Sequence, residues 1–442
     1  MTATGYQTIA DAIAADIASG TLRPGARLPP QREFAYARGI AVSTAARVYA
    51  ELTRRGLVTG EVGRGTYVRT PQAQPPGESV PGLVNLESVF PMLPDQGARM
   101  AASFAAILTE SAFDTAMLPV GPRGTGHARA VAARFLARGG WMPDPARVLF
   151  TGNGRQALAA AMAALAAPGD RIGVECFSYP VVKSIAARIG VTLVPIALDD
   201  QGARPDAIVQ AHREHGLKAL YLQPALHNPL GLTMGVQRRA DIVQVLDEHG
   251  LIAIEDGVYS FLAGEIPLIA RCPEQIVLVD SLSKRLAPGT TLGFAIAPER
   301  LTDRLAAGIR AGGWNAQGFP FAAAVRCMDD GTAAAIAADK IQDARQRQAM
   351  AAAAFEGLAV KGDPRSYHLW LELPEPWRAD TFCAAAARLG IALAPASAFA
   401  IHPGHAPNAV RVALASPPLD VLRQALLSLA RLARSDGDSM IE

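Results

Sequence analysis

The chain has 442 residues, and because a single hydrophobic core stops growing at about 250–300 residues, we expect at least two domains. Half of the residues are hydrophobic and 19% are charged, a composition that excludes a largely disordered protein. The net charge of +2 excludes a protein that binds nucleic acid along its whole length through bulk positive charge.

The charge is unevenly distributed along the chain. Residues 1–70 contain nine Arg, no Lys and five acidic residues, a net charge of +4, whereas the remainder has 33 basic and 35 acidic residues. A small basic segment joined to a near-neutral body predicts that only the first 70 residues meet a polyanion.

The first 70 residues follow the pattern of three helices and a hairpin. Ile9, Ile13 and Ile17 recur every four residues and predict an amphipathic helix that ends at Gly20. The other expected elements are helices at residues 31–38 and 43–55 and strands at residues 57–58 and 66–68. Three helices followed by a hairpin are the outline of a winged helix-turn-helix, an α+β domain.

Polar side chains of this head are placed to contact DNA. Ser43, Thr44 and Arg47 lie together at the start of the third expected helix, the part of a recognition helix that touches DNA. Arg32 opens the second helix, where it can meet a phosphate. Taken singly, each is better explained as part of a solvated face, but the order of elements favours DNA binding. The other candidates form the hairpin tip: Gly63, Arg64, Gly65 and Thr66.

The sequence Leu-Pro-Pro-Gln-Arg-Glu-Phe-Ala at residues 28–35 and the run from Val48 to Val58 resemble the winged-helix head of GntR-type bacterial regulators. The resemblance covers about residues 6–70 and implies double-stranded DNA as a partner. Relatives commonly carry an Arg at the start of the recognition helix, where this chain has Val42. Because an Arg there can read guanine bidentately, the base preference of the family does not transfer.

Residues 71–84 are rich in proline and are expected to form a short, semi-rigid linker. Beyond it, residues 85–442 alternate helical stretches with short β-type runs. This alternation predicts an α/β domain with a mainly parallel sheet. The clearest runs are residues 171–175, 219–222, 252–255 and 276–279.

The strongest chemical pattern of the body is Asp-Ser-Leu-Ser-Lys at residues 280–284, which follows a β-type run. A Lys at a strand end, here Lys284, can form a Schiff base with an aldehyde cofactor, and the hydroxyls of Ser281 and Ser283 can hold its phosphate. Alone the pattern is weak, because most lysines are surface charges.

Other segments supply groups that suit a pyridoxal cofactor. Asp256 follows an apolar run and can keep a pyridine nitrogen protonated, and the amide of Asn228 can donate to a ring oxygen. Gly154 and Arg155 open a helix whose N–H groups suit a phosphate, and Tyr179 offers a ring for stacking. In isolation each also fits loop capping, turn chemistry or core packing.

The chain order of these motifs resembles that of aspartate-aminotransferase-like enzymes, from about residue 85 to the end. The resemblance implies a fold type I α/β domain and pyridoxal 5'-phosphate as cofactor. It implies a Schiff base at Lys284, Asp256 at the pyridine nitrogen, Asn228 with Tyr259 at the ring hydroxyl, and Tyr179 stacked on the ring. The implied phosphate ligands are Gly154, Arg155, Ser281 and Ser283.

Val-Arg-Val-Ala at residues 410–413 resembles the strand whose Arg, here Arg411, clamps a substrate carboxylate. A structural ion pair is the alternative role for this residue. A GntR-type head joined to an aminotransferase-like body resembles MocR-type regulators, in which the body serves as a sensor. That resemblance implies a head-to-tail homodimer with sites at the subunit interface.

The body departs from the enzymes in two places. The position of the phosphate-binding Arg holds Thr291, and no Tyr occurs around residues 117–119, where many relatives offer one to the partner's phosphate. Losing a charge-assisted contact removes about 1.5–3 kcal/mol, or about 10- to 100-fold in affinity. We therefore expect weak or reversible cofactor binding unless Arg155 or Arg285 compensates.

Three functions fit these observations, and a regulator that senses pyridoxal phosphate or a small amine or amino acid is the one we favour. An active aminotransferase with an appended head is the alternative, and a DNA-binding protein with an inert dimerisation body is the third.

The four cysteines form no CxxC pair, which favours a reducing, cytoplasmic location and no metal site. The start of the chain lacks the pattern of a signal peptide, and its uncharged runs are interrupted, so no membrane span is expected.

Overall fold

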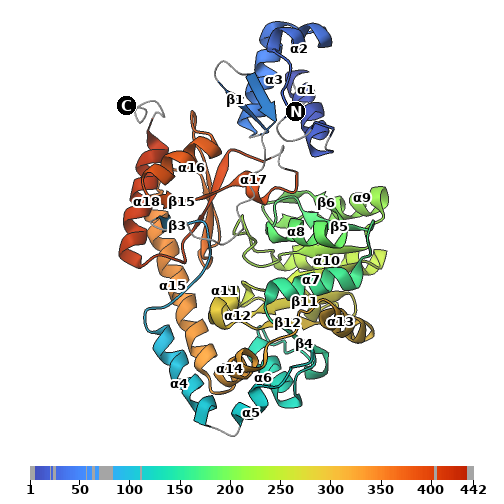
Figure 1. The fold of residues 1–442 in the computed structure, drawn as a ribbon, viewed down its shortest axis with the longest axis vertical. Helices are drawn as coiled ribbons and strands as arrows, with labels where there is room; N and C mark the ends of the chain where they lie inside the picture. The colour runs from blue at the N-terminus through green and yellow to red at the C-terminus, as the bar shows by residue number, and fades with distance from the viewer. Residues whose placement is uncertain are drawn as a thin grey trace.

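The computed structural model describes residues 5–19, 21–22, 26–55, 57–61, 65–68, 83–109, 112–402 and 406–435. In these residues the chain forms an N-terminal head, a large lobe and a small lobe, each with its own hydrophobic cluster (Figure 1). Residues 71–82 of the expected linker lie outside the described residues.

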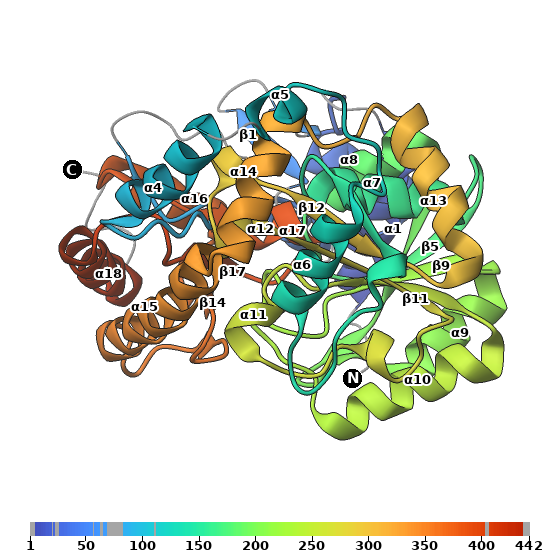
Figure 2. The same ribbon diagram turned by 90° about the horizontal axis from the view of Figure 1, so that it is seen from below.

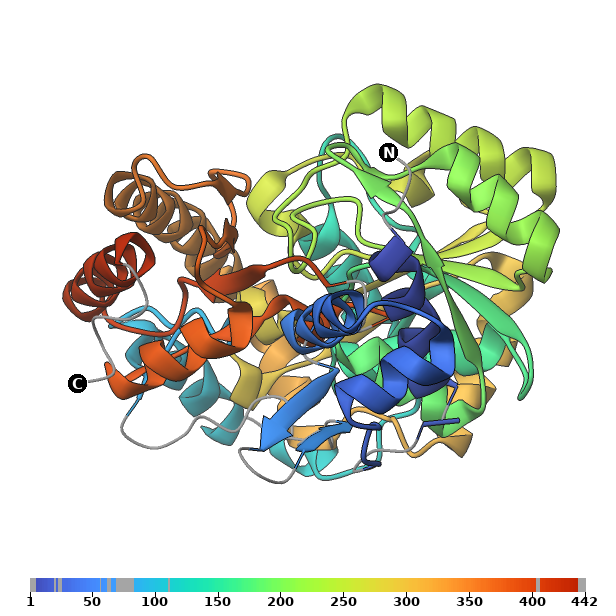
Figure 3. The ribbon, with the colours of Figure 1, turned by 90° about the horizontal axis from the view of Figure 1, so that it is seen from above.

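The head is a three-helix unit with a two-stranded wing (Figure 3). Gly39 ends the second helix with a φ of 61°, in the left-handed conformation that glycine adopts without steric cost. Helices and wing share one core, in which Ala45, Val48 and Leu52 are fully buried. The winged helix-turn-helix is thereby confirmed. Its elements are α1 Gly5–Ala18, α2 Gln31–Arg38, α3 Val42–Arg54, and the antiparallel strands β1 Val58–Glu61 and β2 Gly65–Val68.

The large lobe is built on a seven-stranded sheet of order β4-β12-β11-β10-β9-β5-β6. Strand β12 runs antiparallel to β11 and β4, and the other neighbours pair in parallel. The predicted mainly parallel sheet is confirmed, although β10 and β11 extend beyond the expected runs to include Asp256 and Ser281. The strands are β4 Val148–Thr151, β5 Arg171–Glu175, β6 Thr192–Ile196, β9 Ala219–Leu222, β10 Ile252–Asp256, β11 Ile276–Ser281 and β12 Gly293–Ile296.

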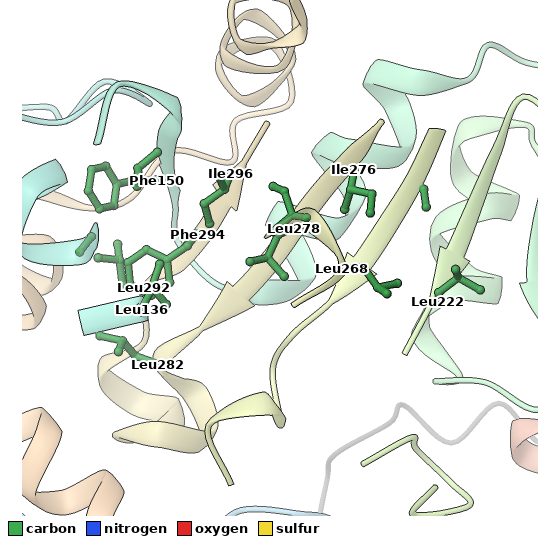
Figure 4. Packing of buried hydrophobic residues seen from close by; sticks show 14 of the residues in the cluster. Leu136, Phe150, Leu222, Leu268, Ile276, Leu278, Leu282, Leu292, Phe294 and Ile296 are labelled. Atoms are coloured by element: carbon green, nitrogen blue, oxygen red, sulfur yellow. The ribbon is translucent and has the colours of Figure 1, made fainter. Parts of the chain in front are cut away.

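Helices cover both faces of this sheet, which explains why its strands are apolar throughout rather than alternating. On one face, Leu278 and Phe294 of the sheet pack with Leu136 of α6 (Figure 4). That face is covered by α6 Gly126–Leu136, α9 Pro205–His215, α10 Val236–His249 and α14 Gly318–Asp329. The other is covered by α7 Gly154–Leu165, α8 Val181–Ile189 and α13 Glu299–Ala311.

The small lobe combines a four-stranded sheet, of order β13-β14-β17-β16, with long helices. Helix α15 packs along α18 on one side of this lobe (Figure 2). Strand β17, which carries Arg411, pairs with β14 and β16. The elements are β13 Val360–Lys361, β14 His368–Glu372, β16 Ala394–Pro395, β17 Ala409–Ala413, α15 Thr332–Ala354, α16 Ala379–Arg388 and α18 Leu419–Arg434.

Short elements connect the lobes and border the sheet edges. They are β3 Val84–Asn85, α4 Gln96–Thr109, α5 Ala112–Ala116, η1 Pro145–Arg147, β7 Leu198–Asp199, β8 Gly202–Ala203, α11 Ser260–Ala263, η2 Leu268–Ala270, α12 Leu282–Arg285, η3 Pro288–Thr290, β15 Ile391–Ala392 and α17 Ala396–Phe399. None of the helices in the described ranges is long and apolar enough to cross a membrane. The parallel strands end at one edge of the large sheet, the edge at which open α/β folds place their ligands.

Candidate functional site

Lys284 lies at this edge, on the four-residue helix α12 that follows β11 directly. Ser281 caps the helix, because its Oγ accepts the backbone N–H of Ser283 at 3.3 Å. The Nζ of Lys284 donates to the backbone carbonyl of Val89 and lies 4.5 Å from the ring centre of Phe90. The amine is therefore held in place by a carbonyl and an aromatic face rather than by a carboxylate.

The surroundings of Lys284 favour its neutral form. Burial is the main cause that lowers its pKa, to about 7. Three positive charges add to this effect, those of Arg411, Arg155 and Lys340, and the negative charge of Asp256 opposes it. A neutral amine is the nucleophilic form that can condense with an aldehyde.

Asp256 is the last residue of β10, next to the strand that leads to Lys284. Its Oδ2 accepts the hydroxyl of Tyr221 at 2.6 Å, and its Oδ1 accepts the backbone N–H of Val258 at 3.1 Å. Burial raises the pKa of Asp256 to about 6, against the lowering effect of both hydrogen bonds. The site thus holds a carboxylate that can pair with a protonated ring nitrogen.

A cluster of three hydroxyls occupies the same edge. The Oγ of Ser283 lies 2.9 Å from the Oγ of Ser281 and 2.9 Å from the Oγ1 of Thr291. Helix α7 begins beside them, and a Cβ at Gly154 would come within 3.0 Å of the Ser281 Oγ. Glycine therefore lets the free N–H groups of a helix start approach the hydroxyl cluster, an arrangement suited to a phosphate.

Two arginines were candidates to replace the charge that is missing at Thr291. Arg285 is buried and engaged, with its Nη2 2.5 Å from the Oδ2 of Asp280, so the structure favours the other of the two alternatives, Arg155. Arg155 is exposed in the first turn of α7, and its Nε donates to the hydroxyl of Tyr179 at 2.8 Å. Of the two, Arg155 alone remains free to meet an anion.

Arg411 projects from β17 of the small lobe into the site. Its Nη1 donates to the Oδ1 of Asn228 at 2.8 Å, and its Nη2 donates to the backbone carbonyl of Glu87. The Cζ of Arg411 lies 4.7 Å from the ring centre of Phe399. Its Nε is buried without a hydrogen-bond partner, and no carboxylate within the described ranges forms an ion pair with it. The alternative role for Arg411, a structural ion pair, is therefore not observed among the described residues.

Two consequences follow from these contacts. Burial lowers the pKa of Arg411, and the more distant charge of Glu87 opposes this effect. Because a buried cation that has no bonded carboxylate among the described residues is costly, the site is electrostatically suited to an anionic ligand. Because a guanidinium only donates, the oxygen of the Asn228 amide faces Arg411, and its NH₂ group is left to donate to a ligand.

Tyr179 and Tyr259 complete the site. Burial raises the pKa of both hydroxyls, and the charges of Arg411 and Asp256 act on both. The structure therefore gathers all the predicted body residues around Lys284, although they come from both lobes. An amine, a buried carboxylate, aromatic rings and a hydroxyl-lined helix start together fit pyridoxal 5'-phosphate.

Sequence reasoning missed Tyr221, Val89 and Lys340. Tyr221 lies inside the otherwise apolar, fully buried strand β9, and a buried Tyr usually has a partner for its hydroxyl, which was the available signal. Val89 and Lys340 carry no such signal, because tertiary packing alone brings them to Lys284.

The candidate DNA-binding residues divide into those that the structure describes and those outside it. Arg32, Ser43 and Arg47 are exposed and Thr44 is half-buried, and the guanidinium of Arg47 lies 4.9 Å from the ring centre of Tyr6. Gly65 and Thr66 belong to β2, while Gly63 and Arg64 lie outside the described residues.

Comparison with known families agrees with this division of the chain. Residues 96–429 match aminotransferase class I and II, and residues 5–68 match the gntR family of bacterial regulatory proteins.

Similar proteins are bacterial transcriptional regulators. The chain is 29% identical to the HTH-type transcriptional regulator YdeF of Bacillus subtilis, over 97% of this chain and 94% of the relative. It is 27% identical to the vitamin B6 salvage pathway transcriptional repressor PtsJ of Salmonella typhimurium, over 69% of this chain and 70% of the relative. It is 26% identical to the pyridoxine biosynthesis transcriptional regulator PdxR of Corynebacterium glutamicum, over 64% of this chain and 63% of the relative.

Solved structures resemble the body. An archaeal alanine:glyoxylate aminotransferase superposes with a TM-score of 0.74 at 20% identity, over 80% of this chain and 91% of the enzyme. At that identity the likeness establishes the fold alone.

Proposed function

Since the chain belongs to the class I and II aminotransferase family and carries a gntR-family head, the combination of MocR-type regulators, we propose that it is a transcriptional regulator whose body senses pyridoxal phosphate, an amino compound, or both. The head comprises residues 1–70, the linker residues 71–84 and the sensing body residues 85–442. Its partner is double-stranded operator DNA, and its location is the cytoplasm, where that DNA is found.

The single observation that carries the proposal is the buried amine of Lys284, which is bonded to the Val89 carbonyl and lies in the same site as the buried carboxylate of Asp256. Asp256 would bind the ring nitrogen, Asn228 and Tyr259 the ring hydroxyl, and Tyr179 the face of the ring. Gly154, Arg155, Ser281 and Ser283 would hold the phosphate. When bound, pyridoxal phosphate supplies an aldehyde that reacts with primary amines and a ring that withdraws electrons. The chain itself lowers the pKa of the Lys284 amine to about 7 by burial and holds the Nζ on the Val89 carbonyl.

Arg411 supports an effector that carries an acid group. Its unpartnered Nε and its bond to Asn228 place a positive charge next to the cofactor groups. A small amino acid would bring an amine to the region of Lys284 and a carboxylate to Arg411. Because Arg411 belongs to the small lobe, such a ligand would bind both lobes, and a change in their arrangement would reach the head through the linker.

Four exposed apolar side chains support assembly as a homodimer. Leu108 and Phe113 expose 57% and 36% of their surface, and Met117 and Leu118 expose 56% and 60%. Four large apolar side chains within eleven consecutive residues are unusual for a solvated surface and typical of an interface. Light scattering of the Leu118→Glu variant is expected to show loss of the dimer, while the control Val360→Glu, at an exposed position of β13, keeps it.

The experiment that tests the proposal is a titration of the purified full chain with pyridoxal phosphate, followed by absorbance. An absorption band of covalently attached cofactor is expected in the wild type and in Lys183→Ala, and not in Lys284→Ala. Lys183 is a matched control because its Nζ also donates to backbone carbonyls, those of Ala398 and Ala400. Absence of the band in the wild type would contradict the proposed sensor.

A gel-shift experiment with the upstream region of the chain's own gene tests the regulatory part. Binding that depends on cofactor or amino compound is expected at moderate salt. If no DNA is retained at any cofactor concentration, the regulator is excluded. Turnover of an amino donor with a keto acid at enzyme-like rates would instead favour the aminotransferase, a candidate supported by the joint presence of Lys284, Asp256 and Arg411.

A further inference from the structure

Lys340 is a fully buried lysine on α15, directly behind the helix that carries Lys284. Its Nζ donates to the backbone carbonyl of Lys284 at 3.1 Å and to that of Leu286 at 2.5 Å. The side-chain amide of Gln96 donates to the same Leu286 carbonyl at 2.8 Å. Two side chains from distant helices thus converge on the end of α12.

These bonds satisfy backbone groups that the short helix leaves open. A helix of four residues has almost no internal hydrogen bonds, so its last carbonyls need partners from elsewhere. A lysine at a helix C-terminus provides such partners and also interacts favourably with the helix dipole. Lys340 therefore fixes the backbone of Lys284 and, with it, the point at which the Lys284 side chain is attached.

Within the part of the chain that the structure describes, no carboxylate is bonded to the Nζ of Lys340. Asp343, on its own helix, is the carboxylate that acts on it, but the Oδ2 of Asp343 is already bonded to Arg347 and to the hydroxyl of Tyr367, each at 2.8 Å. The Nζ of Lys340 shares the Leu286 carbonyl with the neutral amide of Gln96 on α4, and the positive charge of Lys340 acts on Lys284 of α12. Burial lowers the pKa of Lys340 to about 7, and its charge in turn lowers the pKa of Lys284.

We propose that Lys340 is a positioning residue for Lys284, which holds the backbone of α12 in place and puts a second positive charge behind the reactive amine. This inference rests on the proposed cofactor site. Both lysines would then be charged at acidic pH and neutral at alkaline pH, so that Lys340 promotes cofactor attachment most strongly around and below neutrality.

Two substitutions separate the contributions of bonding and charge. Lys340→Gln retains two N–H donors for the two carbonyls and removes the charge, whereas Lys340→Met removes both. The rate of attachment of pyridoxal phosphate is measured by stopped-flow absorbance between pH 6 and 9. Lys340→Gln should be slowed about threefold near pH 6.5, which corresponds to half a pKa unit at Lys284, and should reach the wild-type rate by pH 9. Lys340→Met should bind the cofactor about tenfold more weakly at every pH.

Lys183→Gln is the control, since it removes a lysine with the same kind of carbonyl bonds elsewhere in the body. Its rates should follow the wild type at all pH values. The inference would be overturned if the rates of Lys340→Gln coincided with those of the wild type, or if they were lower by the same factor at every pH. Because Lys340→Gln keeps both N–H donors, this variant tests the inference even where Lys340→Met fails to fold. Absence of the band in the wild type itself would instead show that the proposed cofactor site is wrong.

Discussion

The hydroxyl of Tyr221 donates to the Oδ2 of Asp256 at 2.6 Å, between the neighbouring strands β9 and β10. This bond favours the ionised carboxylate, which burial disfavours, and the pKa of Asp256 consequently lies near 6. The group that would pair with the cofactor ring is therefore ionised at neutral pH but would lose its charge in mild acid.

Replacing Tyr221 with Phe should raise the pKa of Asp256 further, because a donor to the carboxylate is lost. We expect pyridoxal phosphate to bind about tenfold more weakly at pH 6.5, with a smaller loss at pH 8.5. Titration at both pH values measures this. Tyr49→Phe, which removes a hydroxyl bonded to the Pro29 carbonyl in the head, is the control. Equal losses at the two pH values would contradict the role assigned to Tyr221.

By its resemblance to aspartate-aminotransferase-like enzymes, the chain is expected to carry Thr291 in place of a phosphate-binding arginine. Thr291→Arg would add a guanidinium beside Ser283, whose Oγ is now 2.9 Å from the threonine hydroxyl. A charge-assisted contact is worth about 1.5–3 kcal/mol, so pyridoxal phosphate should bind about 10- to 100-fold more tightly. Thr290→Arg, one residue earlier, is the control. The affinity for pyridoxal without its phosphate should not rise; if it does, the gain does not come from the phosphate.

Arg411 should discriminate between effectors by their acid group. In Arg411→Met the affinity for an amino acid should fall about 10- to 100-fold, because the charge-assisted contact is lost. The affinity for a primary amine of the same length without an acid group should change little. Calorimetric titration of the cofactor-loaded protein with both ligands measures the difference. Equal losses for the two ligands would show that Arg411 acts on the structure rather than on the acid group.

The buried amine of Lys284 should make the cofactor-free protein more stable at alkaline pH. In the folded chain its pKa is about 7, whereas in the unfolded chain a lysine keeps its proton to about pH 10.4. The unfolded state therefore binds more protons between these values, and the free energy of unfolding rises with pH by up to about 1.4 kcal/mol per unit. Urea unfolding at pH 7, 8 and 9 should show a smaller slope for Lys284→Met than for the wild type. The exposed Lys218→Met serves as control, and an unchanged slope in Lys284→Met would contradict the prediction.

The head should bind DNA through phosphates at Arg32, which is exposed at the start of α2. Arg32→Ala should weaken binding to all sequences alike and reduce the slope of log K against log salt by about 1. Arg38→Ala, at the opposite end of the same helix, is the matched control and should keep the wild-type slope. A loss at Arg32 confined to one operator sequence would point to base contact instead.

The sequence determined the classes of structure and most of the chemistry. Hydrophobic periodicity and glycine positions define the head helices, since 3.6-residue spacing and left-handed caps are local properties. The strands of the large sheet were also predicted from the sequence, because strands covered on both faces are apolar throughout. The chain order of the motifs predicts Lys284, Asp256, Asn228 and Arg411 as residues of the cofactor site, and their roles there stay a prediction.

The tertiary structure alone decided which of these groups meet, and with what partners. Arg285 and Arg155 were equivalent candidates in sequence, but packing buries the first against Asp280 and leaves the second exposed. Lys340 lies 56 residues from Lys284 in the chain and is nevertheless bonded to its backbone. Such contacts depend on how helices from distant segments pack. A packed interior fixes them by its shape and by the need to satisfy every buried polar group. No local sequence pattern contains this information.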